Sequence, residues 1–207
     1  MVETPSTKET AEFFTMMLLA GCVQRSAVVA WADSVLVNQA EPDPALIDIS
    51  MSGSRPIHEV FSSLDEVRGS LRPVIPARMF MAYLSIEYEA GRKRSVEIVH
   101  VLHHRFVYDE RRDTVLPQDV WRGILDWDIL IHTISYYADD NLPDRWKYSP
   151  KSLSDLLAQR RQRVEDAKSR LDQKVREVLE WGRPYRDVLP VQCFPSGPDH
   201  TIDGHDC

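Results

Sequence analysis

The sequence predicts an all-α fold, a multi-helix bundle of about eight helices with a long C-terminal helix and a loose tail. Apolar residues recur near the helical period of 3.6 along most of the chain, whereas the alternation typical of strands is scarce. Serine, aspartate, proline and glycine stand where these periodic segments begin and end. The 207 residues are 43% hydrophobic, which is enough for a core and too much for a disordered acidic chain.

The first half of the chain predicts five helices. Ser6 and Glu9 form a capping-box pattern ahead of an apolar run, and Gly21 marks the end of that first helix. Asp43 caps a short helix that follows a proline-rich break, with Pro44 at its first position. The five predicted helices cover residues 6–21, 27–39, 44–52, 56–68 and 76–91.

The second half predicts three further helices, over residues 96–108, 117–137 and 152–181. The apolar residues of the middle one surround most of its cylinder, so we expect it to be the most buried helix. The last one carries charged residues around a single narrow apolar seam. That seam is formed by Leu157, Val164, Leu171 and Val178.

The order of the predicted helices divides the chain into three expected regions. Residues 1–150 form a helical core domain, residues 151–190 a long charged helix packed on that core, and residues 191–207 a disordered tail rich in proline, glycine and aspartate. No stretch approaches the roughly 20 consecutive apolar residues of a membrane span, so we expect no membrane partner.

Charge and cysteine content indicate a cytoplasmic protein that does not bind nucleic acid and has no four-thiolate zinc site. The formal net charge of -7 disfavours a nucleic-acid partner and suits a basic protein partner. Cys22, Cys193 and Cys207 are odd in number and widely spaced, which argues against a disulfide framework. The alternative is a lipoprotein acylated at Cys22, because the sequence from Leu19 to Cys22 resembles a lipobox. The acidic Glu12 before the short apolar run argues against export.

One group of residues has the spacing of metal ligands. Glu97, His100 and His104 share a face of the predicted sixth helix, and Asp128 and His132 lie one turn apart on the seventh. Such a set would bind a divalent metal, and Glu-x-x-His is half of the di-iron bundle motif. Only one such motif is present, so the expected cofactor is none and a metal-dependent helical enzyme is the alternative.

Aromatic and acidic residues on and after the predicted seventh helix are the candidate contacts for a protein partner. Aromatic side chains dominate binding energy in protein interfaces, and carboxylates suit a basic partner. The candidates are Trp127, Tyr136, Tyr137, Asp139, Asp140 and Trp146. No phosphate-binding loop, dinucleotide fingerprint or nucleophile elbow is present. We therefore expect an interaction protein. A further alternative is an oligomeric structural component that associates through the long C-terminal helix.

Residues 26–68 carry a resemblance. The run Trp31-Ala32-Asp33, a proline break and the run Leu46-Ile47-Asp48-Ile49-Ser50 follow one another there. This pattern resembles small helical bacterial proteins of unknown function, some of which resemble immunity proteins of contact-dependent toxin systems. The resemblance implies a bacterial origin and a binding role, and it transfers no functional residues.

Overall fold

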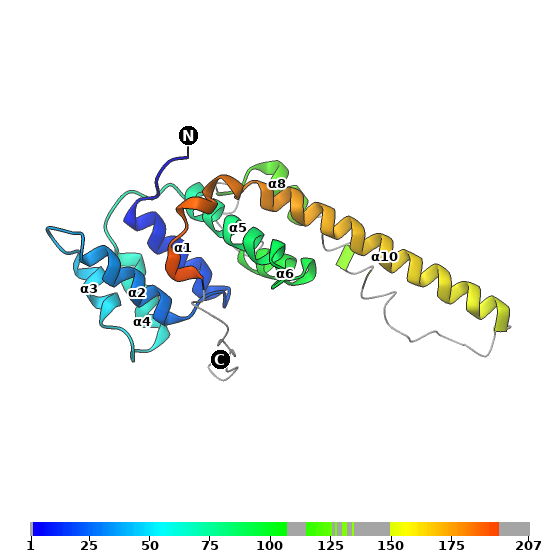
Figure 1. The fold of residues 1–207 in the computed structure, drawn as a ribbon, viewed down its shortest axis with the longest axis horizontal. Helices are drawn as coiled ribbons and strands as arrows, with labels where there is room; N and C mark the ends of the chain where they lie inside the picture. Colours follow the sequence, from blue (N-terminus) through cyan, green and yellow to red (C-terminus); the bar gives the residue numbers. More distant parts are fainter. Residues whose placement is uncertain are drawn as a thin grey trace. The chain divides into compact units, whose positions relative to one another are not determined.

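A computed structural model gives the structure of residues 2–106, 115–125, 127, 130, 131, 134 and 150–194. Within these ranges all regular structure is helical, which confirms the predicted all-α class (Figure 1). None of the helices in the described ranges is both long and apolar enough to cross a membrane.

The chain folds as two compact units. The first unit comprises residues 1–76 and 187–207, and the second comprises residues 77–186. The sequence predicts a core domain over residues 1–150 with the long helix packed on it. In the structure the division falls after residue 76, and the long helix belongs to the second unit, with the helices that lie between residue 77 and its own start.

Among its described residues, the first unit has the α-helices α1 (Thr7–Leu19), α2 (Arg25–Leu36), α3 (Pro44–Ser50) and α4 (Ile57–Glu66). Helix α2 packs on α3, and α4 contacts both α3 and α1. The rings of Phe14 and Trp31 join α1 to α2, with their centroids 5.0 Å apart. The largest fully buried side chains of this core are Phe13, Phe14, Met17, Leu46, Ile49 and Leu64.

A short 3-10 helix, η3 (Val191–Cys193), also belongs to the first unit. It packs on α2, and Cys193 is buried. The first residues of the predicted tail are therefore part of the fold. The rest of that tail, residues 195–207, lies outside the described residues.

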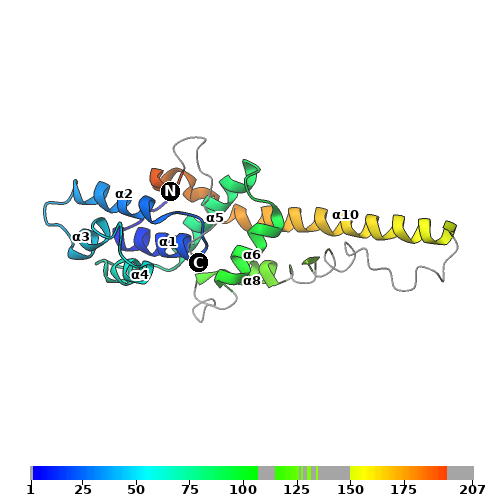
Figure 2. The ribbon, with the colours of Figure 1, turned by 90° about the horizontal axis from the view of Figure 1, so that it is seen from below.

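The second unit contains most of α5 (Val74–Glu89), together with α6 (Ser95–Phe106), α8 (Gln118–Leu125), α10 (Pro150–Glu180) and most of the 3-10 helix η2 (Arg183–Val188). Helix α10 packs on α6 and α8, and it is drawn as one unbroken helix in Figure 2. It begins two residues before the predicted start. The predicted seam is buried at Val164, Leu171 and Val178, and half-buried at Leu157.

Both predicted ends of the first helix are confirmed. Ser6 accepts a hydrogen bond from the backbone N–H of Glu9, and the Glu9 carboxylate accepts one from the backbone N–H of Ser6. At the other end, Gly21 adopts a positive φ of 61°. This conformation lets the N–H groups of Gly21 and Cys22 donate to the carbonyls of Leu18 and Met17, which is the Schellman pattern.

The linker between α4 and α5, residues 67–73, is tied to the N-terminal ends of two helices; we call this linker the strap. Asp43 caps α3 by accepting from the N–H of Ala45, and its second oxygen accepts from the N–H of Arg68 at 2.9 Å. Glu9 has the same two roles at the start of α1. It accepts from the backbone N–H of Ser6, and it also accepts from the N–H of Arg72 at 3.1 Å. Each capping carboxylate therefore also holds one end of the strap.

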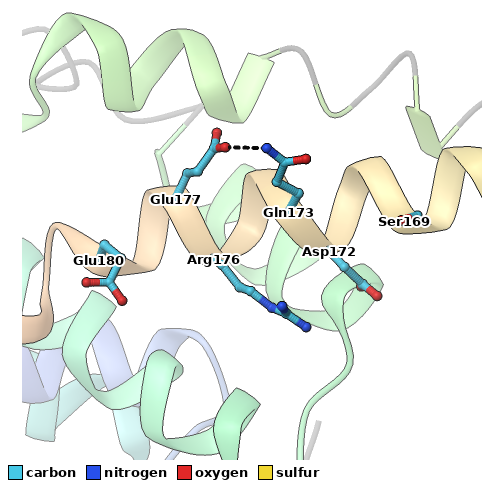
Figure 3. A pocket seen from close by; sticks show the side chains of 6 residues that line it. All are labelled: Ser169, Asp172, Gln173, Arg176, Glu177 and Glu180. Atoms are coloured by element: carbon cyan, nitrogen blue, oxygen red, sulfur yellow. Dashed lines mark hydrogen bonds between the residues drawn. The ribbon is translucent and has the colours of Figure 1, made fainter.

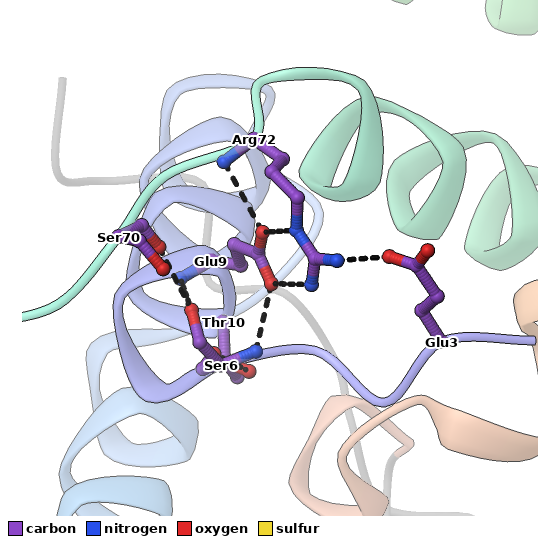
Figure 4. A network of polar contacts seen from close by, with 6 residues as sticks. All are labelled: Glu3, Ser6, Glu9, Thr10, Ser70 and Arg72. Atoms are coloured by element: carbon purple, nitrogen blue, oxygen red, sulfur yellow. Dashed lines mark hydrogen bonds and ion pairs between the residues drawn. The ribbon is translucent and has the colours of Figure 1, made fainter.

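Glu9 is the buried centre of this arrangement (Figure 4). Its side chain is 0% exposed, and it accepts from Arg72 Nε at 2.7 Å and Arg72 Nη2 at 3.0 Å in addition to the two backbone donors. Burial raises the pKa of Glu9, but the hydrogen bonds from Arg72 and from the backbone of Ser6 and Arg72 outweigh burial, so the net pKa lies below the usual 4.5. The carboxylate is therefore ionised in the folded protein at neutral pH.

We predict that Glu9→Gln destabilises the first unit by about 2 kcal/mol, because the amide offers one acceptor oxygen to donors that now share two. Urea unfolding followed by circular dichroism measures this loss. Glu3→Gln is the matched control, since Glu3 pairs with the same arginine but its side chain is 65% exposed. A similar loss in both variants would show that burial of Glu9 is not what matters.

The ion pair of Glu9 and Arg72 makes the stability of the first unit depend on pH. The pKa of Glu9 is lowered in the folded state, so its stabilising contribution is complete above about pH 4.5 and is lost as the pH falls through the folded pKa. The stability difference between the native protein and Glu9→Gln should therefore shrink below that pH. A difference that stays constant down to pH 3 would contradict the assignment.

In the second unit, the end of α10 and the start of η2 lie directly against α5. The Arg78 guanidinium lies 5.5 Å from the Trp181 ring centroid and 5.0 Å from that of Tyr185. Arg186 donates to Ser85 Oγ at 3.0 Å and pairs with Glu89 through both terminal nitrogens. Between these contacts, Gly182 approaches the α5 backbone so closely that a Cβ there would lie 2.7 Å from the Arg78 carbonyl oxygen.

We predict that Gly182→Ala destabilises the second unit by about 1–3 kcal/mol, because backbone atoms of α5 would have to move to admit the methyl group. Thermal denaturation measures the loss as a lower Tm. Gly53→Ala is the control, since a Cβ at Gly53 meets no atom within 4 Å. Equal melting temperatures for the two variants would rule out the close packing of Gly182.

Candidate functional site

A pocket of about 450 Å³ lies along α10, and all its lining residues come from that helix (Figure 3). They are Ser169, Asp172, Gln173, Arg176, Glu177 and Glu180. Three carboxylates and one guanidinium would suit a polar or cationic ligand. These groups, however, already interact with other side chains of the second unit.

Two of the polar side chains of this pocket tie α10 to neighbouring parts of the second unit, and a third contact lies within α10. Asp172 accepts from the hydroxyl of Ser95 at the start of α6, and the Arg176 guanidinium lies 5.9 Å from the Tyr88 ring centroid. Glu177 accepts from Gln173 at 2.9 Å, as Figure 3 shows. We interpret the pocket as a solvated side of a structural helix.

The predicted metal ligands are only in part described. Glu97 and His100 lie on the exposed side of α6. Glu97 accepts from the backbone N–H of Arg94 at 2.7 Å and from Arg94 Nε at 3.4 Å. These two hydrogen bonds lower the pKa of the Glu97 carboxyl. His104 belongs to α6, but its side chain is not described, and Asp128 and His132 lie outside the described residues. The metal site and the metal-dependent enzyme stay predictions.

Within the described ranges, no group of three or more potential ligands comes together. Glu97 instead acts as the acidic partner at the start of its own helix, three residues after Arg94. A sequence pattern of Glu-x-x-His near a helix start therefore has a local explanation in capping.

Of the predicted partner contacts, only Trp127 is described. Its side chain is 0% exposed, so the structure places it in the core of the second unit and its ring offers no surface to a partner. Tyr136, Tyr137, Asp139, Asp140 and Trp146 lie outside the described residues. Their role as partner contacts stays a prediction.

The cysteines described have structural surroundings. Burial raises the pKa of the Cys193 thiol to about 12, so it stays protonated at neutral pH and is a poor nucleophile. The backbone N–H of Cys22 completes the cap at the end of α1, and its side chain is half-buried. Acylation at Cys22 stays a prediction, and Cys207 lies outside the described residues.

The structure draws attention to a feature that motif searching missed. Residues 26–54, which we call the acidic hairpin, contain four acidic residues and no lysine, arginine or histidine. They comprise nearly all of α2, the turn after it and all of α3. A count of charges segment by segment would have found it.

The two helices of the acidic hairpin are joined by polar contacts as well as by their core. Asp33 of α2 accepts a hydrogen bond from the Ser50 hydroxyl of α3. Arg25, just before the hairpin, donates to the Gly53 carbonyl at 3.3 Å. The side chains of Asp33, Glu41 and Asp48 are exposed. The hairpin therefore presents negative charge on a well-supported pair of helices.

No protein-family model, curated protein or solved structure matches this chain. The resemblance of residues 26–68 to immunity-like bacterial proteins consequently stays a prediction from the sequence.

Proposed function

We propose that this protein is a binding protein that recognises a basic protein partner through its first unit. The observation that supports this proposal is the distribution of charge. The first unit contains fourteen acidic and five basic residues, whereas the second contains eighteen acidic and twenty basic residues. The whole negative excess of the chain is therefore carried by one unit.

Most of the basic residues in the first unit serve internal contacts. Arg72 binds Glu9 and Glu3, Lys8 reaches carbonyl oxygens at the end of α4, and Arg55 lies 3.8 Å from Asp48. Exposed carboxylates are spread over α2, α3 and α4 and the turns beside them. They are Asp33, Glu41, Asp48, Glu59, Asp65 and Glu66.

A surface of one sign steers a partner of the opposite sign and raises the rate of association. An immunity-type role, in which an acidic protein binds and blocks a basic toxin, fits this charge and fits the resemblance of residues 26–68. The proposal requires only that the partner is a basic protein, and a basic toxin is the most specific identity we propose for that partner.

The proposal is tested by capture from a lysate of the source cells, with the full chain as bait. The double variant Glu41→Lys, Glu66→Lys reverses two exposed charges of the first unit. Asp155→Lys with Glu177→Lys is the matched control, since it makes the same change at exposed positions of the second unit. Captured proteins are quantified by mass spectrometry at rising NaCl concentrations.

We predict a dominant captured protein of basic isoelectric point whose recovery falls as salt screens the charges. The first-unit variant should lower that recovery about tenfold, and the second-unit variant should leave it unchanged. Equal recovery with both variants, or capture of a protein that is acidic, would contradict the proposal.

A further inference from the structure

Helix α3 has two apolar sides. One side, with Ala45, Leu46 and Ile49, is buried in the first unit. On the other, Ile47 is 41% exposed, and Met51, which directly follows α3 and donates its N–H to the Ile47 carbonyl, is 65% exposed. Residues four apart in a helix lie one above the other, so these two side chains form a short apolar stripe facing solvent.

A third exposed apolar side chain lies in the same hairpin. Val37, directly after α2, is 85% exposed. Single exposed apolar residues are ordinary on protein surfaces. Here three of them occur within residues 37–51, a segment that contains acidic residues and no basic residue. Exposed apolar residues and carboxylates on one pair of helices are the composition of a surface for a basic protein partner.

Three exposed carboxylates belong to the same hairpin as the stripe. Asp48 directly follows Ile47 and is exposed, with Arg55 at 3.8 Å as its cationic neighbour. Asp33 is held beside α3 by the Ser50 hydroxyl, and Glu41 is exposed in the turn between the helices. A ligand on this surface would meet negative charge from α2, from the turn and from α3.

The surface is also held in shape before any partner binds. Asp43, at the start of α3, binds both the α3 backbone and the strap, so the turn is fixed on two sides. Binding to a preformed surface avoids the entropy cost of ordering it. Methionine adds adaptability, because its unbranched side chain fits differently shaped apolar partners.

We propose that the acidic hairpin is a docking surface for a basic amphipathic helix of the partner protein. This inference rests on the proposed function and specifies the partner's chemistry. The hairpin is made of helices whose backbone groups bond internally, so it offers side chains rather than a strand edge to its ligand. The ligand it fits carries apolar residues at helical spacing, flanked by lysine or arginine.

The test uses the full chain and two labelled peptides of equal composition, made of leucine and lysine. In one peptide the leucines follow the helical spacing i, i+3, i+4 and i+7, and in the other they are scattered around the helix. Fluorescence anisotropy at low salt measures both dissociation constants. The expected result is at least about tenfold tighter binding of the amphipathic peptide.

Two variants locate the binding surface. Met51→Lys should weaken binding of the amphipathic peptide about tenfold or more, because it removes an apolar contact and adds a like charge. Lysine at the C-terminal end of a helix is well tolerated, so the fold should survive. Val96→Lys is the matched control, since Val96 is an exposed apolar residue of the second unit, 44% exposed. It should bind as the native chain does.

Equal binding of the two peptides, no binding of either, or equal weakening by Met51→Lys and Val96→Lys would overturn the docking surface. The proposed function would survive those results if the Glu41, Glu66 variant still lost its captured partner. Conversely, unchanged capture by the charge variant would refute the proposed function, and loss of peptide binding in Met51→Lys would then show only that the hairpin binds amphipathic basic helices.

Discussion

The first unit depends on two carboxylates that each perform two tasks. Glu9 and Asp43 begin α1 and α3 by accepting local backbone hydrogen bonds, and each also accepts an N–H from the strap. Helix starts leave several backbone donors without partners, and acidic side chains satisfy them well. Because the same two carboxylates also bind the strap, each helix start is connected to a segment that is distant in the sequence.

The first unit uses some of its acidic side chains to build its own fold. Glu9, which is fully buried, is surrounded by four donors, and Asp43 accepts from the N–H groups of Ala45 and Arg68. Other carboxylates of this unit, among them those of Glu41 and Glu66, are exposed. In the second unit, acidic and basic residues are nearly balanced and pair with one another along α10 and against α5.

The sequence predicted the features that local chemistry decides. The capping box of Ser6 and Glu9, the helix end at Gly21 and the start of α3 at Asp43 all depend on neighbouring residues. The Glu9–Arg72 pair joins residues 63 positions apart, and no periodicity indicates it. Gly182 likewise looks like an ordinary helix end in the sequence, although its role is to let α5 approach.

The candidate site shows the same limit. An aromatic residue near acidic ones fits a core and an interface equally well by composition, and Trp127 is buried. The acidic hairpin, in contrast, can be found from the sequence by its charge alone, but only the structure shows that Ile47 and Met51 face solvent while Leu46 and Ile49 do not.

The most direct test of the hairpin as the recognition surface is amide hydrogen exchange of the full chain, with and without the amphipathic basic peptide. The account predicts slower exchange in residues 33–51 and unchanged exchange in α10, and slower exchange confined to α10 would contradict it.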